Sequence, residues 1–307
     1  MRLKTTFRLQ NVRERGVRLR QLATETFLVK SDDDCELCQK KTVCVTHRTF
    51  ALVSKEQLDE PMWLNPYVHC GYRPTQLPPV LCLKSSLQWN NETVNIWSHV
   101  IGLLYFTWCQ LYDNAVSLPQ MGAKWEDHVV FTGSALCSQI CMFMSACYHI
   151  FGCTSPIARQ WWLTMDVMGI SAGLMGIYFS GIYYAFYCFP TCLTFYMSLF
   201  ILLLLITLLA PMHCDYLTPK FFNKRMGYYH FVYAAVVLYG IIPTIHWIGL
   251  EGGLDSTLVS RFLPNVLTVY GLTGVAFAFY ALMVPERWRP GYFDIVGWSH
   301  QWWHLLI

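Results

Sequence analysis

The sequence predicts an all-α fold, a multi-pass transmembrane helical bundle, and three observations support this prediction. Of the 307 residues, 54% are hydrophobic and only 13% are charged, about half the charged share of a typical soluble domain. The apolar residues gather in six segments of about 20 residues, the length needed to cross a bilayer, and none of the six contains Asp, Glu, Lys or Arg. The charged residues are instead concentrated in the first 85 positions. This pattern excludes a soluble globular enzyme.

The charge distribution divides the chain into two parts. Residues 1–84 form a polar N-terminal arm, and residues 85–307 form the membrane domain. The first 30 residues are rich in Arg and contain no continuous apolar core, so they do not resemble a cleavable signal peptide. We therefore expect the first membrane segment to act as the insertion signal.

The expected membrane helices follow directly from the apolar segments. Six full spans are predicted at residues 94–112, 129–150, 167–186, 193–211, 228–248 and 262–284. A seventh apolar segment, 295–307, has about two-thirds of the length of a span, so we expect a C-terminally truncated seventh helix. In the third segment, the small-xxx-small spacing of Gly169 and Gly173 predicts close approach of a neighbouring helix.

The distribution of basic residues predicts the orientation. Of the 22 Lys and Arg residues, 14 precede the first span and six more lie in the second, fourth and sixth connections, which share its side of the membrane. Only Lys124 and Arg261 lie on the other side. Because positive residues favour the cytoplasmic side, we expect a cytoplasmic N-terminus.

This topology brings four metal-binding side chains to one face of the membrane. His149 ends the second span, Asp166 opens the third, and His300 and His304 lie one turn apart at the start of the seventh. Three neutral imidazoles are the ligand set of a catalytic-type zinc site, and a nearby carboxylate could orient a water molecule or take its proton. Ser145 lies one turn before His149 on the same helical face, where it could donate a hydrogen bond toward the site.

Each histidine taken alone has a simpler interpretation. Five others also lie at or near the ends of apolar segments: His99, His128, His213, His230 and His246. An interfacial histidine is more often a hydrated anchor than a metal ligand. The metal interpretation therefore depends on the combination of the three predicted ligands with the predicted topology.

Residues 85–304 resemble the progestin and adipoQ receptor family of seven-helix membrane proteins. The motifs that carry the resemblance are 91–99 (Asn-Glu-Thr-Val-Asn-Ile-Trp-Ser-His), Ser145-x-x-x-His149, Asp166, 285–287 (Pro-Glu-Arg) and His300-x-x-x-His304. The resemblance implies a zinc ion bound by His149, His300 and His304, with Asp166 and Ser145 nearby.

The resemblance also implies a function. It is strongest toward a Golgi branch of the family that restrains Raf/MAP kinase signalling, in which a cytoplasmic arm holds a Raf-type kinase. The implied function is thus a signalling receptor or regulator in the Golgi membrane, with membrane lipids and a Raf-type kinase as partners and no nucleic acid. Some relatives resemble ceramidases. The alternative is therefore a zinc-dependent amidohydrolase acting on ceramide-like lipids, with Asp166 and Ser145 as catalytic residues.

Overall fold

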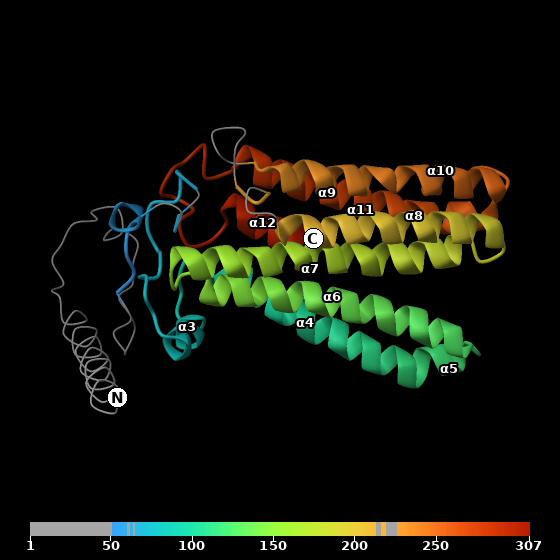
Figure 1. Cartoon of the computed structure of the whole chain (residues 1–307), viewed down its shortest axis with the longest axis horizontal. Coiled ribbons are helices and arrows are strands. Elements are labelled where there is room, and N and C mark those ends of the chain that lie inside the picture. Colours follow the sequence, from blue (N-terminus) through green and yellow to red (C-terminus); the bar gives the residue numbers. More distant parts are fainter. Residues whose placement is uncertain (1–50, 60–61, 64, 213–215, 219–225) are drawn as a thin grey trace, which may run out of the picture. The chain divides into compact units, whose positions relative to one another are not determined.

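The computed structural model describes residues 51–307 except 60–61, 64, 213–215 and 219–225. Within this part of the chain the regular structure is helical, and an isolated antiparallel bridge pairs Val53 with Tyr72. Long helices run side by side through most of the described part (Figure 1). The predicted all-α membrane bundle is confirmed. The first 50 residues of the predicted arm lie outside the described residues.

The helices follow the predicted segments closely. They are α4 (Thr93–Tyr112), α6 (Trp125–Phe151), α7 (Pro156–Ala185), α8 (Pro190–Leu209), α9 (Tyr228–Tyr239), α10 (Ile241–Leu250), α11 (Thr257–Leu282) and α12 (Ser299–Leu306). The predicted span 228–248 corresponds to two helices, α9 and α10, which meet at Gly240. A π-helical turn (Asp113–Ser117) and the short α5 (Leu118–Gln120) follow α4.

Five of the expected spans have both the length and the hydropathy of a membrane-crossing helix: Trp125–Phe151, Pro156–Ala185, Pro190–Met212, Tyr228–Leu250 and Thr257–Leu282. Helix α4 has 20 residues, enough for about 30 Å of bilayer, but it contains no stretch with the hydropathy that these five reach. Three of its polar residues, Thr93, Asn95 and His99, lie on the buried face of the helix.

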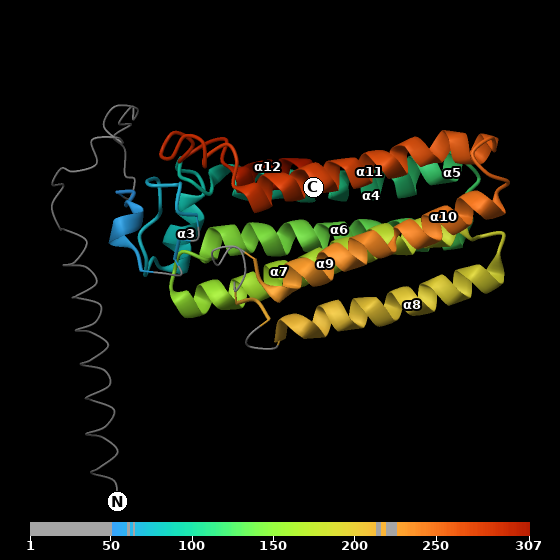
Figure 2. The ribbon, with the colours of Figure 1, turned by 90° about the horizontal axis from the view of Figure 1, so that it is seen from above.

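Helix contacts place α12 within the bundle. Helix α6 packs along α7 and α4, and α12 packs against α11 and α4. Figure 2 shows α12 lying beside α11, seen from above. At Gly169 and Gly176, α7 approaches the backbone of α6 so closely that a Cβ atom would lie 3.3 Å from Cys141 Cα and 2.7 Å from Ser134 O, respectively. The close approach predicted from Gly169 is therefore present.

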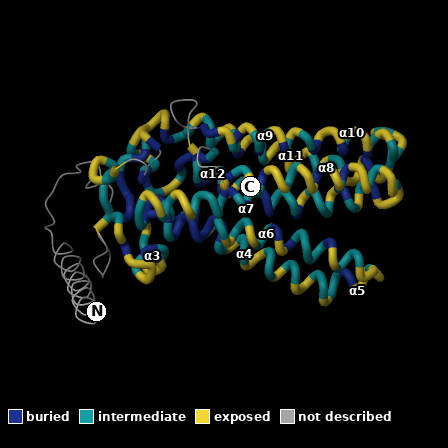
Figure 3. Tube along the Cα trace, in the orientation of Figure 1, coloured by how far each residue is buried: buried dark blue, intermediate teal, exposed yellow. Residues whose placement is uncertain are grey.

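Burial is distributed as expected for a membrane bundle. Only 6% to 33% of the most apolar window of each candidate span is buried, so most of the apolar surface of these helices faces outward. Most of the buried polar residues instead lie toward the end that carries α3 (Pro79–Ser85) and α12. Figure 3 shows dark blue, buried stretches at that end. Polar chemistry is thus concentrated at one end of the bundle.

The described part of the predicted arm contacts this same end. Asn65 Nδ2 donates to Glu286 Oε1 at 2.8 Å, and the backbone N–H groups of His69 and Cys70 donate to the two carboxylate oxygens of Asp294, each at 2.9 Å. Gly71 fits against the same segment because it has a φ of +85° and because a Cβ atom there would lie 2.4 Å from Ile295 Cδ1. The segment between α11 and α12 is therefore held by residues 65–71.

Candidate metal centre

Three histidines meet where α6 ends and α12 begins. His149 lies in the last turn of α6, and His300 and His304 lie one turn apart on α12. One ring nitrogen of each lies within 4.8 Å of those of the other two, and the Nε2 atoms of His300 and His304 are 3.2 Å apart. The structure thus brings together the three residues that the sequence predicts as metal ligands. A metal ion bound to them stays a prediction.

Two nitrogen atoms in this cluster are buried without a hydrogen bond to the described residues. They are His149 Nε2 and His304 Nδ1, on side chains that are 4% and 6% exposed. A buried polar atom without a partner is costly, and a bound ion can supply the missing partner. A metal site requires such a nitrogen atom of each ligand, and His149 Nε2 meets this requirement.

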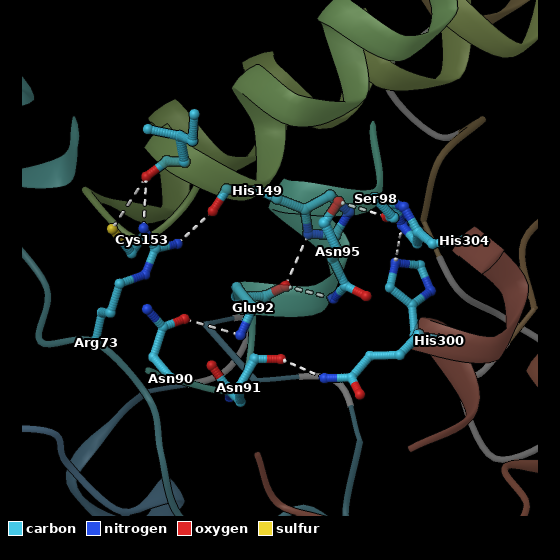
Figure 4. Close-up of polar contacts among 12 residues, drawn as sticks. Arg73, Asn90, Asn91, Glu92, Asn95, Ser98, His149, Cys153, His300 and His304 are labelled. Atoms are coloured by element: carbon cyan, nitrogen blue, oxygen red, sulfur yellow. Dashed lines mark hydrogen bonds and ion pairs between the residues drawn. The ribbon is translucent and has the colours of Figure 1, made fainter. Parts of the chain in front are cut away.

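The carboxylate of Glu92 orients the imidazole ring of His149. Its Oε2 atom is 2.7 Å from His149 Nδ1 and accepts a hydrogen bond from Asn95 Nδ2, also at 2.7 Å (Figure 4). With Nδ1 bound to the carboxylate, Nε2 is the nitrogen that remains for a ligand. Burial alone would raise the pKa of the Glu92 carboxyl, but His149 and Arg73 outweigh it and hold the pKa well below its usual range.

Arg73 holds the end of α6 from the side of the arm. Its guanidinium donates to the backbone carbonyl oxygen of His149 (Figure 4). It also donates to Ile150 O and to Ser85 Oγ. The last carbonyl groups of a helix have no partner within the helix, and a cation interacts favourably with them. Arg73 therefore fixes the turn that carries His149.

Glu286 holds the start of α12. Its side chain is fully buried and accepts hydrogen bonds from Ser299 N, at 2.7 Å, and from Ser299 Oγ. A carboxylate at the first turn satisfies a backbone N–H that has no partner within the helix. Gln301 adds a second tie, because its Nε2 donates to Asn91 O at 3.2 Å and to Ile295 O at 2.8 Å. The position of the histidine pair thus depends on the arm and on the segment before α12.

Asp166 and Ser145 lie together but apart from the ligand cluster. Asp166 is beside Ser145 and within electrostatic range of His149. It does not belong to the group of ligand atoms that converge within the described residues. The two residues thus lie near each other and within electrostatic range of His149, and their role stays a prediction.

His99 is a residue of this region to which the sequence alone assigned no role. It is 5% exposed, neither ring nitrogen has a hydrogen-bond partner among the described residues, and its ring centroid is 4.1 Å from that of His304. Glu92 was also missed. A signal existed for both, because 92, 95–96 and 99 are spaced to lie on one face of a helix, and that polar face is the buried one.

The arrangement fits a zinc site of three neutral imidazoles. Zinc prefers His nitrogen ligands, and a ligating histidine almost always donates its other N–H to a carboxylate or carbonyl group. His149 and Glu92 reproduce that second feature, which was not used to predict the site. A zinc site is expected to have three features that are found here: three imidazole groups, buried ring nitrogen atoms without a hydrogen bond, and a carboxylate, that of Glu92, beside one of the histidines.

Comparison with known proteins identifies the family. Residues 87–307 match the family described as "Haemolysin-III related". The human protein "Progestin and adipoQ receptor family member 3" is 39% identical over 84% of this chain and 82% of its own length. The fruit-fly "Adiponectin receptor protein" is 32% identical over 80% of this chain and 54% of its own length. This chain belongs to the progestin and adipoQ receptor family.

The family match includes the residues of the candidate metal centre, and the similarity to the human relative also includes part of the arm. The matched residues 87–307 contain Glu92, His99, His149 and the histidine pair of α12. The similarity to the human family member covers 84% of the chain, more than residues 87–307 contain, so it extends into the arm. A plant family relative, "Heptahelical transmembrane protein 1" of Arabidopsis thaliana, is 27% identical over 73% of this chain and 67% of its own length.

Proposed function

We propose that this chain is an integral-membrane signalling receptor or regulator with a zinc site formed by His149, His300 and His304. Family membership supports the receptor class, since the human and fruit-fly relatives carry receptor names. The observation that carries the zinc site is the bond from Glu92 to His149 Nδ1, because it leaves the buried Nε2 for a metal among three converging imidazoles.

The site would serve this function by joining elements that are far apart in the sequence. The three histidines would connect the end of α6 to α12, and Arg73 and Glu92 add the arm and α4 to the same point. Binding at the three histidines would therefore stabilise the end of the bundle that contacts the arm. A structural change at the three histidines would therefore be transmitted to the arm through these contacts.

We further propose that the arm faces the cytoplasm and holds a Raf-type kinase, so that the protein restrains MAP kinase signalling as a Golgi anchor. This proposal rests on the family resemblance and on the similarity to the human family member, which includes part of the arm. The described arm residues contact the site-bearing end of the bundle, as expected if the membrane domain presents the arm in one position.

A second candidate function is zinc-dependent hydrolysis of a ceramide-like lipid amide. The observation that favours it is the position of Asp166 beside Ser145 and within electrostatic range of His149. When bound, zinc supplies Lewis-acid chemistry and lowers the pKa of water. Asp166 would act as the proton acceptor, Ser145 would orient its carboxylate, and the helices would bury the acyl chains.

One set of variants separates these functions. We would prepare the full chain as wild type, as His300→Ala/His304→Ala, and as His128→Ala, a histidine at the opposite end of α6 as a matched control. For each we would measure zinc by elemental analysis, co-purification of a Raf-type kinase, and release of fatty acid from a ceramide-like lipid. Elution as a single species and a native circular dichroism spectrum would establish folding.

The expected result is about one zinc per chain in the wild type and in His128→Ala, and none in the double variant. Kinase binding that survives the loss of zinc supports an anchor with a structural zinc. Fatty-acid release that disappears together with zinc supports the hydrolase instead. Absence of zinc from the folded wild type would contradict both forms of the zinc proposal.

A further inference from the structure

Two thiols meet where the arm contacts the end of α6. Cys82 lies on α3 and Cys153 lies two positions after the last residue of α6, and their Sγ atoms are 3.8 Å apart. Both residues are buried and both are free cysteines. A disulfide has a sulfur–sulfur distance of about 2 Å, so the two atoms would need to approach by only about 1.8 Å to form one. This pair plays no part in the function proposed for the three histidines.

Backbone contacts and packing hold the two thiols together. Gln76 N donates to Thr154 O at 2.7 Å, which joins the segment before α3 to the turn after α6. The two cysteines also belong to one buried apolar cluster, which they share with Leu77, Ile96 and Ile150. Because the surrounding structure already holds the sulfur atoms in contact, a bond between them requires movement of the side chains and no rearrangement of the fold.

A positive charge lies close to both sulfur atoms. The Arg73 guanidinium donates to Ser85 Oγ at 3.0 Å and to Ile150 O at 2.9 Å, and it is within electrostatic range of both thiols. A nearby cation favours the thiolate, which is the form of cysteine that reacts with oxidants. Either sulfur atom can donate the hydrogen bond between them, so either can carry the negative charge.

A small polar cavity gives access to Cys153. It has a volume of about 20 Å³, and Cys153 and Gly152 form part of its lining together with Arg73, Glu92 and Arg159. This volume is enough for roughly one or two water molecules. Such a space admits hydrogen peroxide, which is little larger than water, but excludes a bulky oxidant such as a peptide disulfide. The two guanidinium groups of the lining would stabilise the hydroxide that leaves the peroxide.

We propose that Cys82 and Cys153 are a redox-sensitive pair, which hydrogen peroxide oxidises to a disulfide that joins α3 to the end of α6. In the first step, one thiolate attacks a peroxide oxygen, the O–O bond breaks, and a sulfenic acid and hydroxide form. In the second step, the other thiolate attacks the sulfur of the sulfenic acid, the S–O bond breaks, and hydroxide leaves. The two thiols together lose two protons and two electrons, which reduce one peroxide to two water molecules.

The disulfide would restrict the movement of the arm relative to the bundle. It would close a loop of 71 residues, and a cross-link across a loop of this length strongly limits the opened states of the chain. In a reducing compartment the free thiols are the resting state, and a disulfide there is transient and reports oxidation. Peroxide would thus control how readily α3 separates from the end of α6, with or without a metal at the histidines.

Mass spectrometry of the full wild-type chain in nanodiscs tests the proposal. The protein is exposed to hydrogen peroxide, the remaining thiols are blocked with N-ethylmaleimide in denaturant, and the chain is digested without reduction. We expect a cross-linked peptide that contains Cys82 and Cys153 and that dithiothreitol separates into two. Cys188→Ser, at an exposed cysteine just before α8, is the matched control and should give the same peptide. Cys82→Ser and Cys153→Ser should each lose it.

The same wild-type samples can contradict the proposal without any variant that has to fold. The peroxide concentration is chosen so that the exposed Cys188 thiol is oxidised, which shows that the oxidant has acted. If Cys82 and Cys153 then both remain reactive toward N-ethylmaleimide, the proposal is wrong. It is equally wrong if one of them stops at a sulfinic acid or pairs with a different cysteine.

Hydrogen exchange tests the effect of the disulfide on the structure. In peroxide-treated wild-type protein, the amides of residues 76–86 and 150–155 should exchange roughly tenfold more slowly than in the reduced protein, because the cross-link limits local opening. Dithiothreitol should restore the faster exchange, and Cys82→Ser should show no change on addition of peroxide. Unchanged exchange in cross-linked wild-type protein would overturn the proposal that the disulfide joins the arm to the bundle.

Discussion

Glu92 joins three parts of the candidate metal centre through one carboxylate. It contacts His149 of α6 and Asn95 of α4, and it begins the helix that also carries His99. A carboxylate that orients a ligating histidine typically contributes 10- to 100-fold to metal affinity. We therefore expect Glu92, which is not one of the three predicted ligands, to influence how strongly those ligands bind a metal.

We therefore expect Glu92→Gln to lower zinc affinity at least tenfold while the protein still folds. The substitution keeps the size and an acceptor oxygen but removes the charge that stabilises His149 as a donor. Competition with a chromophoric chelator measures the affinity. Glu56→Gln, at an exposed position of the described arm, is the matched control and should retain wild-type affinity. Equal affinity in both variants would show that Glu92 serves packing and not the metal.

Local spacing in the sequence predicts some residues of the centre. Residues that act through contacts between distant segments cannot be predicted in this way. The pair His300 and His304 is visible from local spacing, and His149 follows from topology, because all three lie at helix ends. Arg73 and Glu286 could not be predicted in the same way. Arg73 acts on the carbonyl groups of α6, and Glu286 acts on Asn65 and on α12. Such contacts arise only when distant segments pack together.

At the level of elements, hydropathy predicts the helices within a few residues but not their breaks. The segment 228–248 reads as one span, yet α9 ends at Tyr239 and α10 begins at Ile241. Gly240 lies between them because the hydroxyl groups of Tyr178 and Tyr270 occupy the space that a Cβ atom would need. The tyrosines of α7 and α11 explain why residue 240 is glycine, and the break also has a local cause, because Pro243 cannot donate a hydrogen bond to the carbonyl group of Tyr239 and its ring crowds that group.

The segment between α11 and α12 is the element whose position matters most for the histidine pair. Asp294 accepts two backbone N–H groups of residues 69–70, so Asp294→Asn should place an amide NH₂ against one of these donors. We expect a loss of about 1–3 kcal/mol in the local stability of this contact. Hydrogen exchange measures it, with faster exchange in residues 66–73 and 291–301. Asp255→Asn, at an exposed position beyond α10, is the control. Unchanged exchange would show that Asp294 does not hold the arm.

At the level of the whole molecule, the asymmetry of charge predicts one orientation. Of the eight Lys and Arg residues in the described part of the chain, six lie at the end of the bundle that carries the histidine cluster: Lys55, Arg73, Lys84, Arg159, Arg287 and Arg289. Lys124 and Arg261 lie toward the other end, near the start of α6 and in the first turns of α11. If the positive-inside rule holds, the candidate metal centre faces the cytoplasm.

Glycosylation mapping tests this orientation. We would insert an Asn-Ser-Thr acceptor within a flexible Gly/Ser linker between Gly252 and Gly253, where both residues have positive φ and no neighbouring atom within 4 Å of a Cβ position. A second variant carries the same insert after Ser155, between α6 and α7. We expect the first insert to be modified and the second to remain unmodified, as judged by a glycosidase-sensitive shift on a gel. The native Asn91-Glu92-Thr93 sequence does not confuse the readout, because Asn91 is 2% exposed. Modification of the second insert alone would place the histidine cluster on the lumenal side. The arm could then hold no cytoplasmic kinase, so this one result bears on the proposed signalling function as well as on the topology.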